Sequence, residues 1–244
     1  MALYQPAVGD DGLGKDYTMH IEPGLVTGAK LALSVVTAVG TAGFTAKHAV
    51  QAIRETGVMS FAARTVAATI AVFIFFQVLP HHAVGVSEVH FIFGSTIFLI
   101  FGAAPAAIGL ALGLLAQGLL FAQFDLPQYG MNVTTIVVPL LAIKMVADRI
   151  IAPGTAYADV SYKQALVLST TYQAGVVAWV GFWVFYGQGF GSEVLASVGT
   201  FGAAYMLVVA LEPFVDLAVL AGAKMIRAQL SATGLAAPRL FSAV

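Results

Sequence analysis

The sequence contains no cysteine. Disulfide bonds, thioether-linked haem, iron–sulfur clusters and thiolate zinc sites all depend on cysteine sulfur, so each of them is excluded. Any metal ion must therefore be bound by histidine, aspartate, glutamate, methionine or a backbone or terminal nitrogen.

Charged residues are also scarce. Asp, Glu, Lys and Arg together make up 9% of the 244 residues, whereas hydrophobic residues make up 59%. An ordinary soluble domain is about one-quarter charged. The composition therefore indicates an integral membrane protein, with the lipid bilayer as its surroundings. The net charge of −1 and the lack of a basic run argue against a nucleic-acid partner.

Enzyme motifs are missing as well. The chain has no G-x-S-x-G elbow, no H-E-x-x-H pair and no lysine after a glycine run of the Walker type. The glycine-rich stretch 187–191 follows a membrane helix rather than a strand, so it predicts a turn and not a phosphate loop. We therefore expect a protein that is not an enzyme and has no catalytic residues or bound cofactor.

Long apolar runs account for most of the chain. A spanning helix needs about 20 apolar residues, and seven candidates follow: residues 25–44, 64–79, 89–101, 105–124, 133–151, 165–186 and 198–225. The third is short, so we expect it to span half the bilayer or to pack inside the other helices. Alternatively, the third and fourth form one helix broken at 102–105. The predicted fold class is an all-α, polytopic transmembrane bundle of about seven helices.

The distribution of charge predicts the orientation. Because Lys and Arg concentrate on the inner side of membrane proteins, the chain is expected to have its N-terminus outside and its C-terminus inside. The segments that this places inside carry nine basic residues: Lys47, Arg54, Arg64, Lys144, Arg149, Lys163, Lys224, Arg227 and Arg239.

This topology divides the chain into three parts. Residues 1–24 form a polar N-terminal extension, residues 25–226 the transmembrane bundle, and residues 227–244 a cytoplasmic tail. The extension, the loop 81–90 and the turn-rich segment 124–132 share the outer face, where together they form a cup suited to substrate capture.

Three of the five histidines, His81, His82 and His90, lie in one polar gap between two apolar helices. Imidazole is the commonest protein ligand for late first-row metals. His90 is the strongest candidate ligand, although a hydrogen-bonded histidine at the start of a helix explains its position equally well. His81 and His82 are adjacent and would diverge on a helix, so they could share a metal only in a loop.

Ionisable residues inside the predicted helices are Lys30 in the first and Glu212 and Asp216 in the last. The two acids are four residues apart and therefore share a helix face. Because buried charges are costly in lipid, they are expected to face a partner or a polar cavity. We favour a structural pairing of Lys30 with the acids over a proton or ion relay.

Three sequence features carry a resemblance to a known family. Met19-His20-Ile21, followed by a Pro-Gly turn and at once by a membrane helix, resembles the start of the CbiM/NikM family. Further matches are His90 before a short glycine-containing helix, and the Gly-Met-Asn turn at 130–132. Members of this family are the substrate-capturing membrane components of energy-coupling-factor cobalt and nickel transporters. The similarity covers about residues 19–139, and by helix count it extends to the end.

The resemblance implies a metal site. A cobalt or nickel ion, the transported substrate, would be held in square-planar fashion at Met19, His20 and His90, through a terminal amine, an amide nitrogen and two imidazole rings. Eighteen residues precede Met19 and give it a peptide nitrogen instead of an amine. Either this arm is trimmed, or translation starts at Met19, or the site is altered, with His81 or His82 as less favoured replacements.

The resemblance also implies partners and a location. These are a transmembrane coupling subunit and cytoplasmic ATPase subunits of an energy-coupling-factor complex, in the cell inner (plasma) membrane. The alternative is a family descendant that acts as a structural or accessory membrane subunit of a larger complex without metal transport. A third hypothesis is an independent ion-coupled carrier that uses Glu212 and Asp216.

Overall fold

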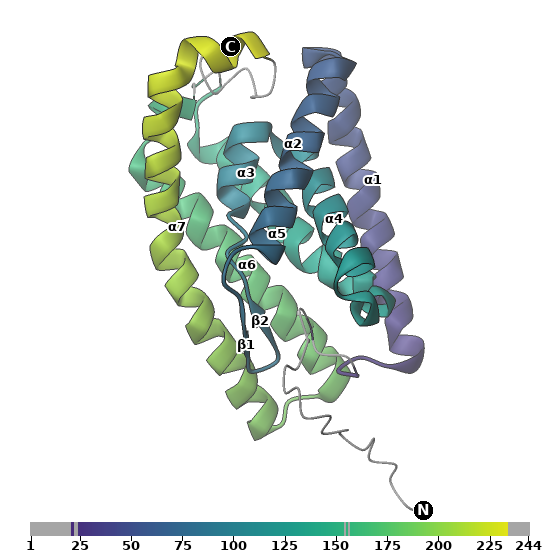
Figure 1. The fold of residues 1–244 in the computed structure, drawn as a ribbon. Coiled ribbons are helices and arrows are strands. Elements are labelled where there is room, and N and C mark those ends of the chain that lie inside the picture. The colour runs from purple at the N-terminus through teal and green to yellow at the C-terminus, as the bar shows by residue number, and fades with distance from the viewer. Residues whose placement is uncertain (1–20, 22–23, 154, 156, 234–244) are drawn as a thin grey trace, which may run out of the picture.

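The computed structural model describes residues 21, 24–153, 155 and 157–233. Seven α-helices make up the bundle (Figure 1): α1 (Leu31–Thr56), α2 (Val58–Gln77), α3 (Gly94–Phe101), α4 (Ala103–Leu120), α5 (Tyr129–Ile150), α6 (Tyr162–Gln188) and α7 (Ser192–Thr233). One hairpin, β1 (His82–Val84) and β2 (Ser87–Val89), and three short 3-10 helices, η1 (Gly28–Lys30), η2 (Gln123–Gln128) and η3 (Tyr157–Asp159), complete the described part of the chain.

The predicted all-α transmembrane bundle of about seven helices is confirmed. Every helix except α3 is long and apolar enough to cross a membrane, which makes the protein a multi-pass membrane protein. Large apolar side chains on α1, α2 and α7 point outward, among them Val35, Ile70, Leu207 and Phe214. In lipid, such faces are solvated by acyl chains and need no protein partner.

The first helix is longer than its apolar core suggested. We expected it to end at residue 44, but α1 continues to Thr56. Residues 45–56 are rich in Ala, Lys, Gln, Arg and Glu, which favour helix even where they leave the lipid. The helix ends only at Gly57, which has φ of 80°, a conformation that glycine adopts without steric cost.

The prediction of a helix over residues 89–101 was wrong at its start. Residues 87–89 form strand β2, and α3 begins at Gly94. Valines before and after Gly85 favour extended strands, and Gly85 supplies the turn with φ of 64°. The remaining helix is almost entirely buried, so the expectation that it packs inside the others is confirmed.

Helices α3 and α4 are separated by a single residue. Gly102, with φ of 87°, ends α3 and begins α4, so the chain breaks sharply between them. Pro105 lies in the first turn of α4, where its missing N–H leaves no helical hydrogen bond unmade. The break predicted at 102–105 therefore separates two distinct helices.

Small residues let α2 and α4 approach closely. A Cβ placed on Gly109 would lie 2.5 Å from the Ala68 Cβ, and one on Gly113 would lie 2.6 Å from Val72 Cγ1. These two glycines are four residues apart on one face of α4, the arrangement that allows close backbone packing between membrane helices. Gly40 and Gly43 of α1, by contrast, have no described atom within 4 Å of such a Cβ.

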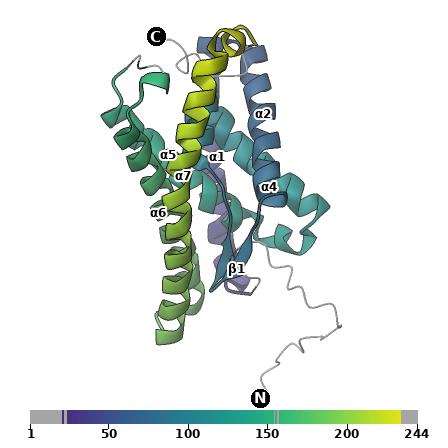
Figure 2. The same cartoon turned by 60° about the vertical axis from the view of Figure 1, so that its left-hand side comes forward.

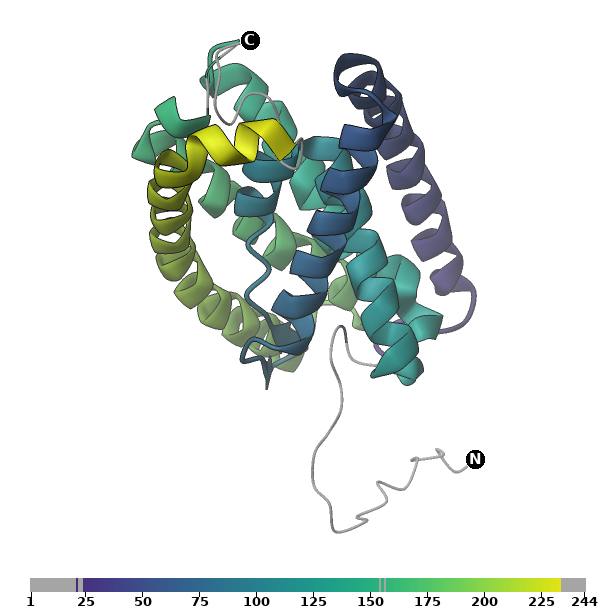
Figure 3. The ribbon, with the colours of Figure 1, turned by 45° about the horizontal axis from the view of Figure 1, so that its top comes forward.

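The chain passes up and down through the bundle and gathers its connections at two ends (Figure 1). The hairpin, the start of α1, η2 and the α6–α7 connection lie at one end. The hairpin lies against α7, as Figure 2 shows. The spanning part of α7 is Ser192–Val219, and the remainder turns across the opposite end of the bundle (Figure 3).

Candidate functional site

The hairpin sets the geometry of the candidate site. Its strands pair His82 with Val89, Ala83 with Glu88, and Val84 with Ser87. Successive side chains of an extended segment point to opposite sides. Glu88 and His90, two residues apart, therefore point to the same side.

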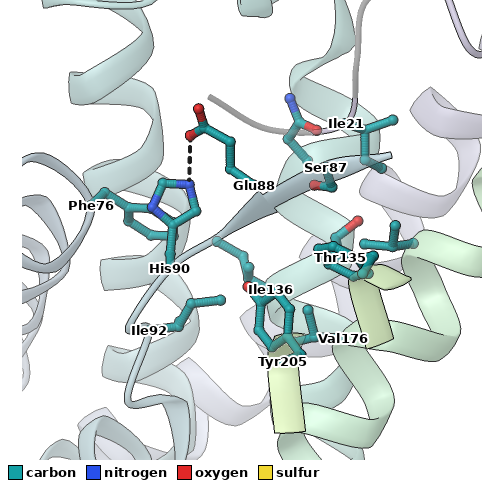
Figure 4. Close-up of a pocket in the computed structure, with 13 residues that line it drawn as sticks. Ile21, Phe76, Ser87, Glu88, His90, Ile92, Thr135, Ile136, Val176 and Tyr205 are labelled. Atoms are coloured by element: carbon teal, nitrogen blue, oxygen red, sulfur yellow. Dashed lines mark ion pairs between the residues drawn. The ribbon is translucent and has the colours of Figure 1, made fainter. Parts of the chain in front are cut away.

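Glu88 and His90 form a buried pair. Nε2 of His90 lies 3.2 Å from Oε2 of Glu88, and the two side chains are 3% and 6% exposed, His90 being the more buried. The ring of His90 packs edge-on against Phe76 of α2, with centroids 5.0 Å apart. Figure 4 shows the carboxylate above the imidazole, with the ion pair drawn between them.

Both side chains line a small cavity at the hairpin end of the bundle (Figure 4). The volume open to the centre of a water molecule is about 20 Å³, and one water needs about 10–15 Å³ by this measure. The cavity thus has room for a single ion or water molecule but not for an organic substrate. Its polar lining consists of Ser87, Glu88, His90, Asn132, Thr135 and Tyr205.

Distant parts of the sequence meet at this cavity. Asn132 and Thr135 come from the first turns of α5, Tyr205 comes from α7, and Ile21 comes from the segment before α1. Both the hairpin and the start of α5 thus contribute, as the predicted cup requires. Ile21 is 1% exposed, so its side chain is packed into the site.

Helix α7 holds the segment that carries His90 at two points. The Tyr205 hydroxyl hydrogen-bonds the backbone of His90. Glu212, seven residues and about two turns further along α7, accepts hydrogen bonds from the backbone N–H and the hydroxyl of Ser95, at 3.3 and 2.7 Å. Because Ser95 lies in the first turn of α3, the Glu212 carboxyl caps that helix from a neighbouring helix.

Glu212 also joins α6 to this cluster. Its second oxygen accepts a hydrogen bond from the Ser169 hydroxyl and one from Nε2 of Gln173, each at 2.9 Å. The carboxyl is completely buried, and donors from α3 and α6 satisfy both of its oxygens. It therefore ties three helices together beneath the cavity.

The predicted pairing of Lys30 with the acids was wrong. Lys30 is exposed and donates hydrogen bonds to the carbonyl oxygens of Tyr186 and Gly187, at 2.9 and 3.3 Å. These carbonyls end α6, where a cation is favoured by the helix dipole. The ammonium and Glu212 are thus engaged with different partners, and the side chain of Asp216 lies outside the described residues.

The structure brings together only part of the predicted metal site. His90 faces the cavity, and the ring of His81 stacks on it with centroids 5.3 Å apart. His82 is exposed on β1, and Met19 and His20 lie outside the described residues. Among the described residues, no group of three or more His, Asp or Glu side chains is placed to hold a metal ion.

Sequence analysis missed Glu88 as a site residue. The Glu-x-His spacing in an extended segment would have placed it beside His90, had the strand been recognised. An imidazole nitrogen and a carboxylate oxygen together form a partial ligand set for a divalent first-row metal.

A family model matches the chain over residues 20–230: CbiM, the cobalt uptake substrate-specific transmembrane region. No curated protein and no solved structure matches it. The matched region contains every described residue of the cavity and all six membrane-spanning segments. The chain therefore belongs to the CbiM family of cobalt-uptake membrane components, a family of transporters and not of enzymes.

Proposed function

We propose that this protein is the substrate-binding membrane component of an energy-coupling-factor transporter that takes up a divalent transition metal, cobalt or nickel. The observation that carries the proposal is the buried His90 on a partly polar cavity with room for one ion. Family membership supports cobalt as the substrate. Imidazole ligands suit Co(II) and Ni(II) alike, so the cavity chemistry is compatible with both.

The proposed ligands are Met19, His20 and His90. One observation supports including the first two. His20 is covalently bonded to Ile21, which lines the same cavity as His90, and consecutive Cα atoms are about 3.8 Å apart. His81, whose ring stacks on that of His90, is the less favoured alternative, and the exposed His82 is the least favoured.

We further propose that the cavity end of the bundle faces the outside of the inner (plasma) membrane. Basic residues gather at the opposite end, the pattern of an inner face, among them Lys47, Arg54, Arg64, Lys144, Arg149 and Lys163. The metal would then enter from outside and be released inward. A transmembrane coupling subunit and cytoplasmic ATPase subunits would drive that release.

The test is a calorimetric titration of the full chain in detergent with Co(II) and Ni(II). His90→Ala is expected to abolish stoichiometric binding. The matched control is His48→Ala on α1, a half-buried histidine whose ring contacts that of Phe44 away from the cavity. A chain that begins at Met19 shows whether a free amine at that residue strengthens the site.

The outcomes separate the candidate functions. Binding that depends on His90 and not on His48 supports the transporter. If neither the full chain nor the chain beginning at Met19 binds either metal, the proposal fails, and an accessory membrane subunit without metal transport becomes the better interpretation. Metal uptake that follows a proton or sodium gradient and ignores ATP would instead support an independent carrier.

A further inference from the structure

We propose that Glu88 is itself a ligand of the transported metal ion and binds it beside His90. The metal would then be held by a mixed set of nitrogen and carboxylate oxygen atoms. This inference rests on the proposed function, since it assigns a further ligand at the same site. Glu88 is not one of the ligands that the family resemblance implies, which are Met19, His20 and His90.

The distance between the two side chains matches that of neighbouring metal ligands. Two atoms that each lie about 2.1 Å from an ion, at right angles to one another, are about 3 Å apart. Nε2 of His90 and Oε2 of Glu88 are 3.2 Å apart. An ion about 2.1 Å from both atoms lies off the line that joins them, so the imidazole and the carboxylate bind it by turning towards a common point, with the ring proton on Nδ1.

The backbone holds both ligands in this arrangement. Strand pairing fixes Glu88 opposite Ala83, and the Tyr205 hydroxyl holds the backbone of His90. The turn at Gly85 packs tightly on α7, because a Cβ there would lie only 2.4 Å from the carbonyl oxygen of Ser197. The site is thus preorganised, which lowers the free-energy cost of gathering the ligands around an ion.

Charge also favours a cation at Glu88. Its carboxyl group is 6% exposed, and the described residues that line the cavity include no Lys or Arg. Burying a carboxylate costs free energy, and a positive group or a metal ion bound to it offsets that cost. A divalent cation between Glu88 and His90 supplies that positive charge and fits a cavity of about 20 Å³.

A carboxylate oxygen changes the metal that the site prefers. Square-planar sites made only of nitrogen ligands select Ni(II) and Cu(II) strongly. Sites that contain oxygen ligands and bind the ion through more than four atoms suit metals that are six-coordinate. We therefore expect Glu88 to make the site less selective for nickel over cobalt than a site of nitrogen ligands alone.

The experiment titrates Co(II) into the full chain in detergent and records both affinity and the visible d–d absorption spectrum. The variants are Glu88→Gln, which removes the charge, and Glu88→His, which exchanges an oxygen ligand for nitrogen. Glu193→Gln, an exposed acid in the first turn of α7, is the matched control. Thermal unfolding without metal shows whether each variant is folded.

Glu88→Gln is expected to weaken Co(II) binding by at least about tenfold, since loss of a group that only orients a ligand already costs about that much, and to change the d–d band. Glu88→His is expected to restore binding, move the band to higher energy and raise the ratio of Ni(II) to Co(II) affinity. Glu193→Gln should bind like the unaltered protein.

Two results would overturn the inference and leave the proposed function standing. In the first, Glu88→Gln binds with unchanged affinity and spectrum while His90→Ala does not bind. In the second, Glu88→Gln binds more weakly with an unchanged band and Glu88→His does not restore binding, which would make Glu88 a positioning residue for the His90 ring. Failure of the unaltered chain to bind any metal would overturn the proposed function itself.

Discussion

Replacing Glu212 tests whether the buried carboxyl beneath the cavity holds the bundle together. Its oxygens accept four hydrogen bonds, two from Ser95 and one each from Ser169 and Gln173. Glu212→Ala leaves these donors without an acceptor in a part of the protein that water does not reach. Glu212→Gln keeps one carbonyl oxygen as an acceptor but turns an NH₂ group towards the remaining donors.

The size of the effect follows from the number of bonds. Side-chain hydrogen bonds in a membrane protein contribute about 0.6 kcal/mol on average and about 1.7 kcal/mol at most, so four of them contribute about 2–7 kcal/mol. We expect Glu212→Ala to lower the free energy of unfolding by about 3–5 kcal/mol, because bonds to a carboxylate lie at the stronger end of the range. Glu212→Gln should lower the free energy of unfolding by about half as much, since it retains one acceptor.

The assay is thermal unfolding in detergent followed by the fluorescence of Trp179 and Trp183 on α6. A chain of this size shifts in Tm by about 2–4 °C per kcal/mol, so Glu212→Ala should unfold about 10 °C lower than the unaltered protein. The control is Glu193→Ala at the exposed start of the same helix, which is expected to change Tm by about 2 °C or less. A Glu212→Ala variant that unfolds as the control does would refute the reasoning.

Three further predictions concern packing and helix ends. Gly109→Val should lower Tm and weaken assembly of the bundle, because even a Cβ there lies 2.5 Å from the Ala68 Cβ; Gly40→Val, on the open face of α1, is the control. Arg64→Met should destabilise the fold by about 1–3 kcal/mol, measured as Tm, because the buried guanidinium donates to the last carbonyl of α3 at 3.0 Å. Gly187→Ala should weaken Co(II) binding in calorimetry, because its Cβ would lie 2.0 Å from the carbonyl oxygen of Leu25 and displace the segment leading into α1; unchanged affinity would contradict that link.

Much of the fold could be predicted from the sequence. Apolar runs of sufficient length predict spanning helices because lipid leaves no other way to satisfy backbone hydrogen bonds. The spacing of Gly109 and Gly113 is visible in the sequence, but only the structure shows that α2 is the helix that packs on them. His90 was recognised as a candidate ligand because a histidine in a polar gap between apolar helices is conspicuous in a chain with only five histidines.

The sequence did not reveal how the polar groups are paired. Hydropathy places Lys30 and Glu212 in membrane helices, but it contains no information about which helix ends or side chains face them. The structure shows Lys30 on the α6 carbonyls and Glu212 on Ser95, Ser169 and Gln173. Partners 39 to 157 residues apart in the chain become neighbours only when the helices pack.

Local sequence, then, determined the membrane class, the positions of the helices and the presence of a histidine near one end. Only the tertiary structure decided that residues 82–89 form a hairpin, that Glu88 and His90 point to the same side of it, and that α5 and α7 close a cavity around them. The physical reason is the separation along the chain between the residues that each feature depends on. Helix formation in lipid depends on the transfer of neighbouring residues and their own backbone bonds, whereas a site for one ion depends on distances of a few ångströms between elements that are remote in sequence.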